Sequence, residues 1–224
     1  MKILLAACNA KYIHSNLAVF NLKAYAKEYD SQVVLREYTI NQLKDDILKD
    51  IYRCHPDVVC VSCYIWNITF VRELMQDLRK ILPDVPFWAG GPEVSYDAET
   101  FLGKNPAFNG VMVGEGEETF LELLKHYVDG SVTLEETRGL VYRKADGALQ
   151  NNGWRQLMDL SKVPFAYENL EDFENRIIYY ESSRGCPFSC SYCLSSIDKK
   201  LRFRDINLVK KELQFFLDHK VPQV

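Results

Sequence analysis

The sequence has no apolar run long enough to cross a bilayer and no excess of basic charge. A spanning helix needs roughly 18 or more consecutive apolar residues, and none of these 224 residues forms such a run. Lysine and arginine total 27 against 31 aspartates and glutamates, a net charge of −4. We therefore expect neither a nucleic-acid partner nor a membrane partner. The apolar stretch at residues 3–7 is also shorter than the ~7–15 residues of a secretory signal, so we expect a cytoplasmic protein.

The cysteines are odd in number and unevenly spread. An odd count without a secretory signal argues against a disulfide framework. Four of the seven stand apart in apolar surroundings and are expected to be buried, with Cys63 also able to reach a loop. The other three lie within eight residues of one another. They are Cys186, Cys190 and Cys193.

Residues 1–129 alternate between strand and helix signals. Strands are expected at 2–7, 32–35, 57–62, 86–89 and 110–113. Helices are expected at 17–27, 43–52, 70–82 and 118–127, the first with Ser15 as its N-cap. This alternation predicts an α/β fold with five parallel strands and helices on both faces of the sheet. Ligands of such sheets bind beyond the carboxyl ends of the strands, so the relevant loops are 9–14, 63–66, 90–95 and 114–117.

The remaining residues do not continue this alternation. A hairpin is expected around Asp146-Gly147 within a connector, followed by a strand at 177–180 and an amphipathic helix at 206–217 capped by Asp205. Residues 221–224 resemble the opening of another strand. One strand–helix unit cannot bury its own faces, so we expect the chain to be part of a longer protein. The expected divisions are 1–130, 131–175 and 176–224.

The three bunched cysteines have the spacing CxxxCxxC in the segment Cys186-Pro187-Phe188-Ser189-Cys190-Ser191-Tyr192-Cys193. Structural zinc normally has four ligands from two such knuckles, and only His219 lies downstream. A 4Fe-4S cluster normally has four thiolates, so three would leave one iron open to a substrate or cofactor. Zinc, an iron–sulfur cluster and inert buried cysteines are the three alternatives.

This cysteine loop resembles that of the radical S-adenosylmethionine (SAM) superfamily, whose motif places an aromatic residue before the last cysteine, as Tyr192 does here. The resemblance implies a 4Fe-4S cluster on Cys186, Cys190 and Cys193. The open iron would bind SAM, whose reductive cleavage yields a 5′-deoxyadenosyl radical. It also implies that residues 176–224 begin a partial barrel, and that an electron donor such as flavodoxin or ferredoxin serves the cluster.

The preceding domain resembles the Rossmann-like, flavodoxin-like domain of cobalamin-binding radical SAM enzymes. That family has S-x-L after its third strand and G-G after its fourth, and here Ser62-Cys63-Tyr64 and Gly90-Gly91 hold these places. The resemblance implies that these residues contact the nucleotide tail of cobalamin. The family's D-x-H-x-x-G loop is absent from residues 9–14, so no histidine from that motif would bind cobalt. A dinucleotide G-x-G-x-x-G is absent there too.

Several other residues are candidates at the same edge. Glu93, Gly114 and Gly116 are expected to lie beside the corrin, although the acids of Gly114-Glu115-Gly116-Glu117 also suit the start of a helix. Arg184 and Arg202 could hold the carboxylate of a ligand or simply lie on the surface.

Together these features predict the N-terminal part of a cobalamin-dependent radical SAM enzyme that resembles a methyltransferase. The implied cofactors are cobalamin, a 4Fe-4S cluster and SAM, and the substrate cannot be inferred. Since most of the implied barrel is missing, the chain alone is expected to be inactive. One alternative is a radical SAM oxidoreductase whose N-terminal domain is degenerate. Another is a binding protein stabilised by zinc or a cluster.

Overall fold

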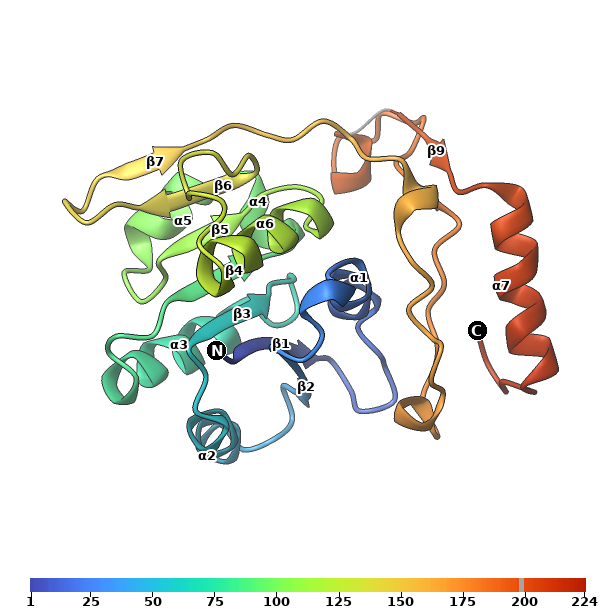
Figure 1. Ribbon diagram of the computed structural model, residues 1–224, viewed down its shortest axis with the longest axis horizontal. Coiled ribbons are helices and arrows are strands. Elements are labelled where there is room, and N and C mark those ends of the chain that lie inside the picture. The colour runs from blue at the N-terminus through green and yellow to red at the C-terminus, as the bar shows by residue number, and fades with distance from the viewer. Residues whose placement is uncertain (198–199) are drawn as a thin grey trace.

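A seven-stranded sheet organises the computed structural model, which describes residues 1–197 and 200–224 (Figure 1). The strand order is β2-β1-β3-β4-β5-β6-β7. The strands are β1 (Ile3–Asn9), β2 (Val33–Thr39), β3 (Val58–Ser62), β4 (Phe87–Gly90), β5 (Gly110–Met112), β6 (Leu140–Arg143) and β7 (Leu149–Asn151). The first five are parallel, and β6 and β7 are antiparallel.

Helices cover both faces of this sheet because its central strands are apolar on both sides. Side chains alternate along β1, so Leu4 and Ala6 enter one core while Ile3 and Leu5 enter the other. The first core lies against α2, α3 and α5, and the second lies against α1 and α6. The helices are α1 (Leu17–Tyr25), α2 (Lys44–Cys54), α3 (Ile68–Ile81), α4 (Pro92–Ser95), α5 (Ala98–Lys104), α6 (Glu117–Val128) and α7 (Ile206–Asp218).

The prediction of a parallel α/β sheet is confirmed, but its five-strand count is wrong. The expected hairpin forms, and β6 pairs with the free edge of β5, with Val111 opposite Val141. Residues Leu140, Val141 and Tyr142 are all buried there. A hairpin with one apolar strand gains both hydrogen bonds and burial by joining an open sheet edge, and the sheet therefore has seven strands.

The start of α1 also differs from the prediction. Its N-cap is Asn16, whose side-chain oxygen accepts from the Val19 amide at 3.5 Å. Ser15 instead donates its hydroxyl to the Ile177 carbonyl at 2.9 Å. Ser15, which the local pattern predicts as the helix cap, therefore forms a long-range contact instead.

The C-terminal residues form no regular strand–helix unit. The expected strand at 177–180 is absent, and Ile177 makes a single parallel bridge with His14. A two-stranded ribbon follows instead, in which β8 (Ser183–Arg184) pairs with β9 (Arg202–Phe203). Residues 221–224 do not form a strand either. The predicted helix is present as α7, and Asp205 caps it by accepting from the amides of Asn207 and Leu208.

The C-terminal segment lies along α1 (Figure 1). Its apolar cluster is built on Tyr167, Phe173, Ile178 and Phe216, and Phe20 of α1 packs against it. The rings of Phe20 and Phe173 are 4.7 Å apart between centroids. Among the described helices, none combines the length and apolar character that crossing a membrane would require.

Candidate functional site

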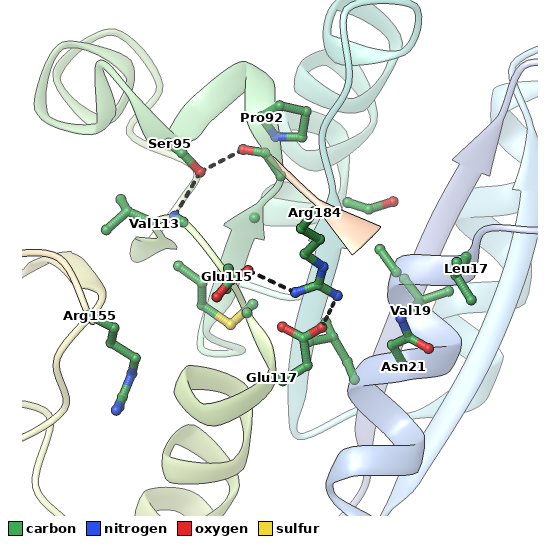
Figure 2. A pocket seen from close by; sticks show the side chains of 18 of the residues that line it. Leu17, Val19, Asn21, Pro92, Ser95, Val113, Glu115, Glu117, Arg155 and Arg184 are labelled. Carbon is green, nitrogen blue, oxygen red and sulfur yellow. Dashed lines mark hydrogen bonds and ion pairs between the residues drawn. The ribbon is translucent and has the colours of Figure 1, made fainter. Parts of the chain in front are cut away.

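A cavity of about 530 Å³ opens at the carboxyl edge of the sheet (Figure 2). Its wall includes the last residues of β3, β4 and β5, which are Ser62, Gly90 and Met112. Deeper lining comes from Leu5 and Val61 of the sheet and from one side of α1. The cavity therefore begins at the loops expected to bind a ligand and continues between α1 and the sheet.

Ser62 is held at the end of β3 by buried amides. The Asn16 side chain donates to its hydroxyl oxygen at 3.3 Å. Asn67, which is fully buried, donates to the Ser62 carbonyl at 3.1 Å and to the Cys8 carbonyl at 2.9 Å. Because Asn67 joins the ends of β1 and β3, the hydroxyl of Ser62 has a fixed position on the cavity wall.

At Gly90 and Gly91 the cavity wall consists of main-chain atoms without side chains. Gly91 has φ +108°, and a Cβ there would lie 2.5 Å from the Cys63 carbonyl oxygen. Only glycine suits this position. Ser95 donates to the Gly91 carbonyl at 2.8 Å and accepts from the Gly114 amide at 3.2 Å (Figure 2). One buried hydroxyl thus connects the two glycine loops.

Gly114 and Gly116 line the same cavity. A Cβ on Gly114, where φ is +76°, would approach the Trp154 ring to 3.1 Å, and one on Gly116 would lie 3.0 Å from Leu22. Both positions therefore bring the main chain close to other parts of the wall. Trp154 belongs to the connector after β7, which closes one side of the cavity.

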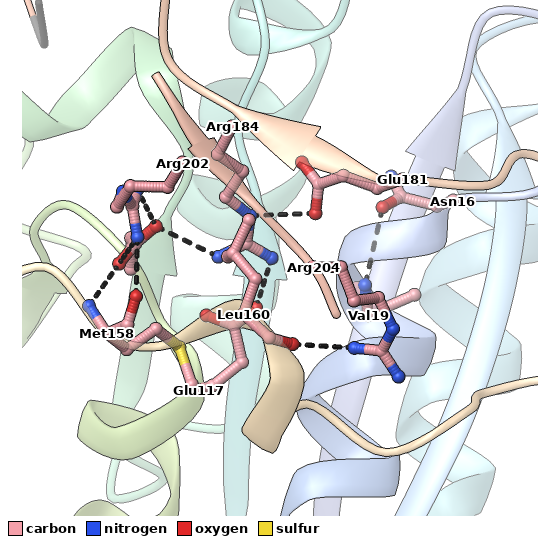
Figure 3. Close-up of polar contacts among 10 residues, drawn as sticks. Asn16, Val19, Glu117, Met158, Leu160, Glu181, Arg184, Arg202 and Arg204 are labelled. Carbon is pink, nitrogen blue, oxygen red and sulfur yellow. Dashed lines mark hydrogen bonds and ion pairs between the residues drawn. The ribbon is translucent and has the colours of Figure 1, made fainter. Parts of the chain in front are cut away.

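The acids between these glycines are neutralised by arginines (Figures 2 and 3). Arg184 pairs with Glu117 and with Glu115, the latter at 3.2 Å, while Arg202 pairs with Glu115 at 2.6 Å. Burial acts to raise the pKa of Glu115, but hydrogen bonds from Arg202 and the Met158 amide and the charge of Arg184 outweigh it. The net result is a lowered pKa, which keeps this carboxylate ionised.

Arg184 and Arg202 therefore fit neither of the two roles considered from sequence. Arg184 also donates to Glu181 at 2.7 Å, and Arg202 donates to the Met158 carbonyl at 2.7 Å. Burial raises the pKa of Glu181, and the charge of Arg184 opposes this rise. Arg184 belongs to β8 and Arg202 belongs to β9, so their ion pairs attach the two-stranded ribbon to the loop before α6.

The cysteine loop starts directly after Arg184, with Gly185 at φ +90°. Cys186 and Cys193 are half-buried and Cys190 is exposed. Across residues 1–197 and 200–224, no three His, Cys, Asp or Glu side chains are grouped so as to hold a metal. Tyr192, the aromatic residue of the motif, is 91% exposed.

Two residues expected at the cofactor site lie outside the cavity wall. Cys63 is fully buried in the core, where burial raises the pKa of its thiol, and Glu93 is exposed. Tyr64 does line the cavity, and its ring stacks on that of Trp66 at 4.3 Å between centroids. Of the eight residues predicted on these three loops, the wall includes six, which are Ser62, Tyr64, Gly90, Gly91, Gly114 and Gly116.

Several wall residues were not expected from the sequence. Asn21 belongs to no recognisable motif, and Trp154 lies in a connector that carried no ligand signal, whereas Ser95 lies in the expected loop 90–95 but had no assigned role. Glu181 lines the cavity although it follows the sheet by a long connection. Only the helical pattern of α1 could have placed Asn21 on the face turned toward the sheet.

Comparison with known proteins identifies the family. Residues 3–124 match the model of the B12 binding domain, and the chain belongs to this family. It is 28% identical over 221 residues to the cobalamin-dependent radical SAM methyltransferase TokK of Streptomyces tokunonensis, covering 89% of this chain and 31% of that protein. It is 26% identical to the 2-(S-pantetheinyl)-carbapenam-3-carboxylate methyltransferase of Streptantibioticus cattleyicolor, over 74% of this chain and 26% of that protein.

Solved structures agree. The cobalamin-dependent SAM radical enzyme OxsB, with aqua-cobalamin and SAM bound, superposes with a TM-score of 0.75 at 19% identity, covering 94% of this chain and 31% of that one. The predicted resemblance to cobalamin-binding radical SAM enzymes is thus confirmed. The chain spans about a third of the length of these relatives.

Proposed function

We propose that the cavity binds cobalamin and that the chain contributes this site to a cobalamin-dependent radical SAM methyltransferase. The observation that carries the proposal is the position of the cavity. It joins the ends of β3, β4 and β5 to a slot beneath α1, in a chain of the B12-binding family. Ser62, Gly90 and Gly91 occupy the wall where the tail of the cofactor would pass.

The shape of the cavity separates two parts of such a ligand. The corrin is a broad macrocycle and would stay at the mouth, beside Tyr64, Gly114 and Gly116. The nucleotide tail is narrow and would enter between α1 and the sheet, where Leu5 supplies apolar contact. The bare backbone at Gly90 and Gly91 allows the tail to approach the main chain closely.

The cysteine loop has the donor chemistry for the second cofactor. Cys186, Cys190 and Cys193 would hold a 4Fe-4S cluster, whose open iron would take SAM. When bound, the cluster supplies one electron to cleave SAM, and cobalamin supplies a carrier for a methyl group. Tyr192 and Gly185 would shape the loop around the cluster.

The ion pairs of Arg184 fix the position at which the cysteine loop begins. Arg184 immediately precedes Gly185 and Cys186, and it binds Glu115 and Glu117 beside the cavity. The start of the cluster loop is therefore attached to the wall of the corrin site. Such an arrangement would keep the two cofactors close, as methyl transfer from a carrier to a radical substrate requires.

The complete reaction is also part of the proposal. Two relatives are named as methyltransferases, which favours methylation over other radical chemistry. A reduced flavodoxin or ferredoxin would deliver the electron. Since an exposed cluster and three thiols need a reducing environment, the proposal includes a cytoplasmic location.

Corrin retention tests the proposal on the chain itself. The protein is mixed anaerobically with hydroxocobalamin, and visible absorption is measured after gel filtration. We expect about one corrin per chain for the wild type and for Ala148→Trp, which changes an exposed residue of the hairpin turn. Ala18→Trp, which places the same ring at an exposed residue of the cavity wall, should retain at least tenfold less. Folded wild-type protein that retains no corrin would overturn the proposal.

A further inference from the structure

One buried polar side chain on α1 lacks a protein partner. Asn21 is only 7% exposed, and its amide forms no hydrogen bond with any of the residues at 1–197 and 200–224. Other buried asparagines nearby are paired, as Asn16 is with Ser62 and Asn67 is with the carbonyls of Cys8 and Ser62. A buried amide without a protein partner keeps its hydrogen-bonding groups for water or for a ligand.

The amide of Asn21 faces open space. It lines the large cavity, on the side where α1 faces the sheet (Figure 2). It is also absent from the unpaired side-chain atoms that are sealed from solvent, so a molecule in the cavity can reach it. The structure therefore leaves the two N–H donors and the carbonyl acceptor of this amide available within the slot.

A neighbouring space of about 30 Å³ does not explain this side chain. Asn21 borders it together with Arg204 and Glu212. Those two charges satisfy each other through hydrogen bonds of 3.0 Å and 2.6 Å, and Arg204 also donates to the Leu160 carbonyl at 2.6 Å. The space has room for about one water molecule, which could use only part of the amide.

We propose that Asn21 forms a hydrogen bond with the nucleotide tail of the corrinoid. This inference rests on the proposed function and adds a specificity residue to it. The tail carries ring nitrogens and ribose hydroxyls that match an amide, which both donates and accepts. Glu115 and Glu117 lie on the same wall and disfavour the tail's phosphate deep in the slot, although Arg184 offsets part of their charge. The base and ribose are therefore the groups that Asn21 contacts.

Two corrinoids separate the tail from the ring. Hydroxocobalamin has the nucleotide tail, and cobinamide lacks it. Binding of each is measured by anaerobic equilibrium dialysis with the wild type, with Asn21→Leu, which keeps the volume and removes the amide, and with Asn207→Ala, which changes an exposed asparagine of α7. We expect Asn21→Leu to bind hydroxocobalamin roughly tenfold more weakly, the value of one buried hydrogen bond. Cobinamide should bind all three proteins equally, whether weakly or not at all.

Thermal unfolding without corrinoid distinguishes a ligand-binding role of Asn21 from a role in stabilising the fold. Replacing an unpaired buried amide with an apolar side chain of equal volume should raise Tm or leave it unchanged. An Asn21→Leu protein with unaltered hydroxocobalamin affinity would overturn the inference. So would equal weakening of both corrinoids, or a lowered Tm together with weaker binding. If the wild type binds neither corrinoid, the proposed function itself fails, and the inference fails with it.

Discussion

The sheet and the C-terminal segment are held together by different forces. The sheet, residues 3–151, buries both faces of its central strands under helices, and its cores are almost entirely apolar. The segment after residue 152 relies on an aromatic cluster, on a small apolar cluster of Met158, Leu160 and Val163, and on arginine–carboxylate pairs, which include Arg176–Glu37 at 2.6 Å and Arg204–Glu212 at 2.6 Å. Apolar burial is non-directional, whereas ion pairs depend on geometry and pH. The segment that carries the cysteines therefore depends more on geometry and pH than the sheet does.

The largest expected effect separates binding of the iron–sulfur cluster from binding of cobalamin. After anaerobic reconstitution with iron and sulfide, we expect about four irons per wild-type chain, and near zero for Cys190→Ala, which removes one of only three thiolate ligands. Corrin retention should not change, because Cys190 lies outside the cavity wall. Cys54→Ala is the matched control, since this half-buried cysteine is far along the chain from the loop. Normal iron content in Cys190→Ala would contradict the assignment.

The next largest effect concerns the buried ion pair between Arg204, which precedes α7, and Glu212 of α7. Arg204 and Glu212 are both about 7% exposed, and Tyr180 donates to Glu212 at 2.6 Å. Arg204→Ala leaves this carboxylate buried without its partner, so it should cost about 3–5 kcal/mol of local stability. Hydrogen exchange should show faster exchange in α7 and little change in β1 and β3. The double variant Arg204→Met/Glu212→Leu should recover much of the loss, and equal damage in both variants would contradict the ion-pair account.

A pH-dependent effect is expected where β8 joins the sheet region. The pKa of Glu115 is lowered in the folded chain, so its stabilising contribution is complete above its ordinary value of 4.5 and is lost as pH falls through the lowered value. Glu115→Gln should remove about 1.5–3 kcal/mol at pH 7, the range for hydrogen bonds to charged groups. Protection of the amides of β8 and β9, corrected for the intrinsic pH dependence of exchange, should fall in the variant at pH 7, and in the wild type only on acidification. A pH-independent wild type would contradict this role of Glu115.

The smallest expected effect concerns the contact between the start of α1 and the C-terminal segment. Ser15→Ala removes the hydrogen bond to the Ile177 carbonyl, a loss of about 1 kcal/mol. Exchange should rise around residue 177, while α1 stays intact because Asn16 is its cap. Asn16→Ala serves as the contrasting variant and should loosen the start of α1. Fraying of α1 in Ser15→Ala would restore the sequence-based prediction of Ser15 as the cap.

The two regions also differ in how far sequence predicts them. Five parallel strands follow from apolar runs such as residues 57–62, because burial on both faces leaves a continuous pattern. The attachment of β6 to β5 could not be predicted, since a hairpin signal is local and its partner strand is not. The strand expected at 177–180 failed for a related reason, because its apolar residues pack into the aromatic cluster around Phe216 instead.

The candidate site shows a similar limit. Ser62, Gly90, Gly91, Gly114 and Gly116 lie on the cavity wall because each lies at or shortly after the end of a parallel strand, a topological rule that is visible in sequence. The pairing of Arg184 with Glu115 and Glu117 joins residues nearly seventy positions apart and has no local signal. The unpaired amide of Asn21 is likewise apparent only from a three-dimensional count of hydrogen-bond partners.

The most direct measurement is a crystal structure of this chain grown anaerobically with hydroxocobalamin. We expect one corrinoid per chain, with the corrin beside Gly114 and Gly116. Its nucleotide should lie between α1 and the sheet, in contact with Ser62 and Asn21. A corrinoid bound at another surface, or a slot beneath α1 that contains only water in the presence of saturating ligand, would contradict the account.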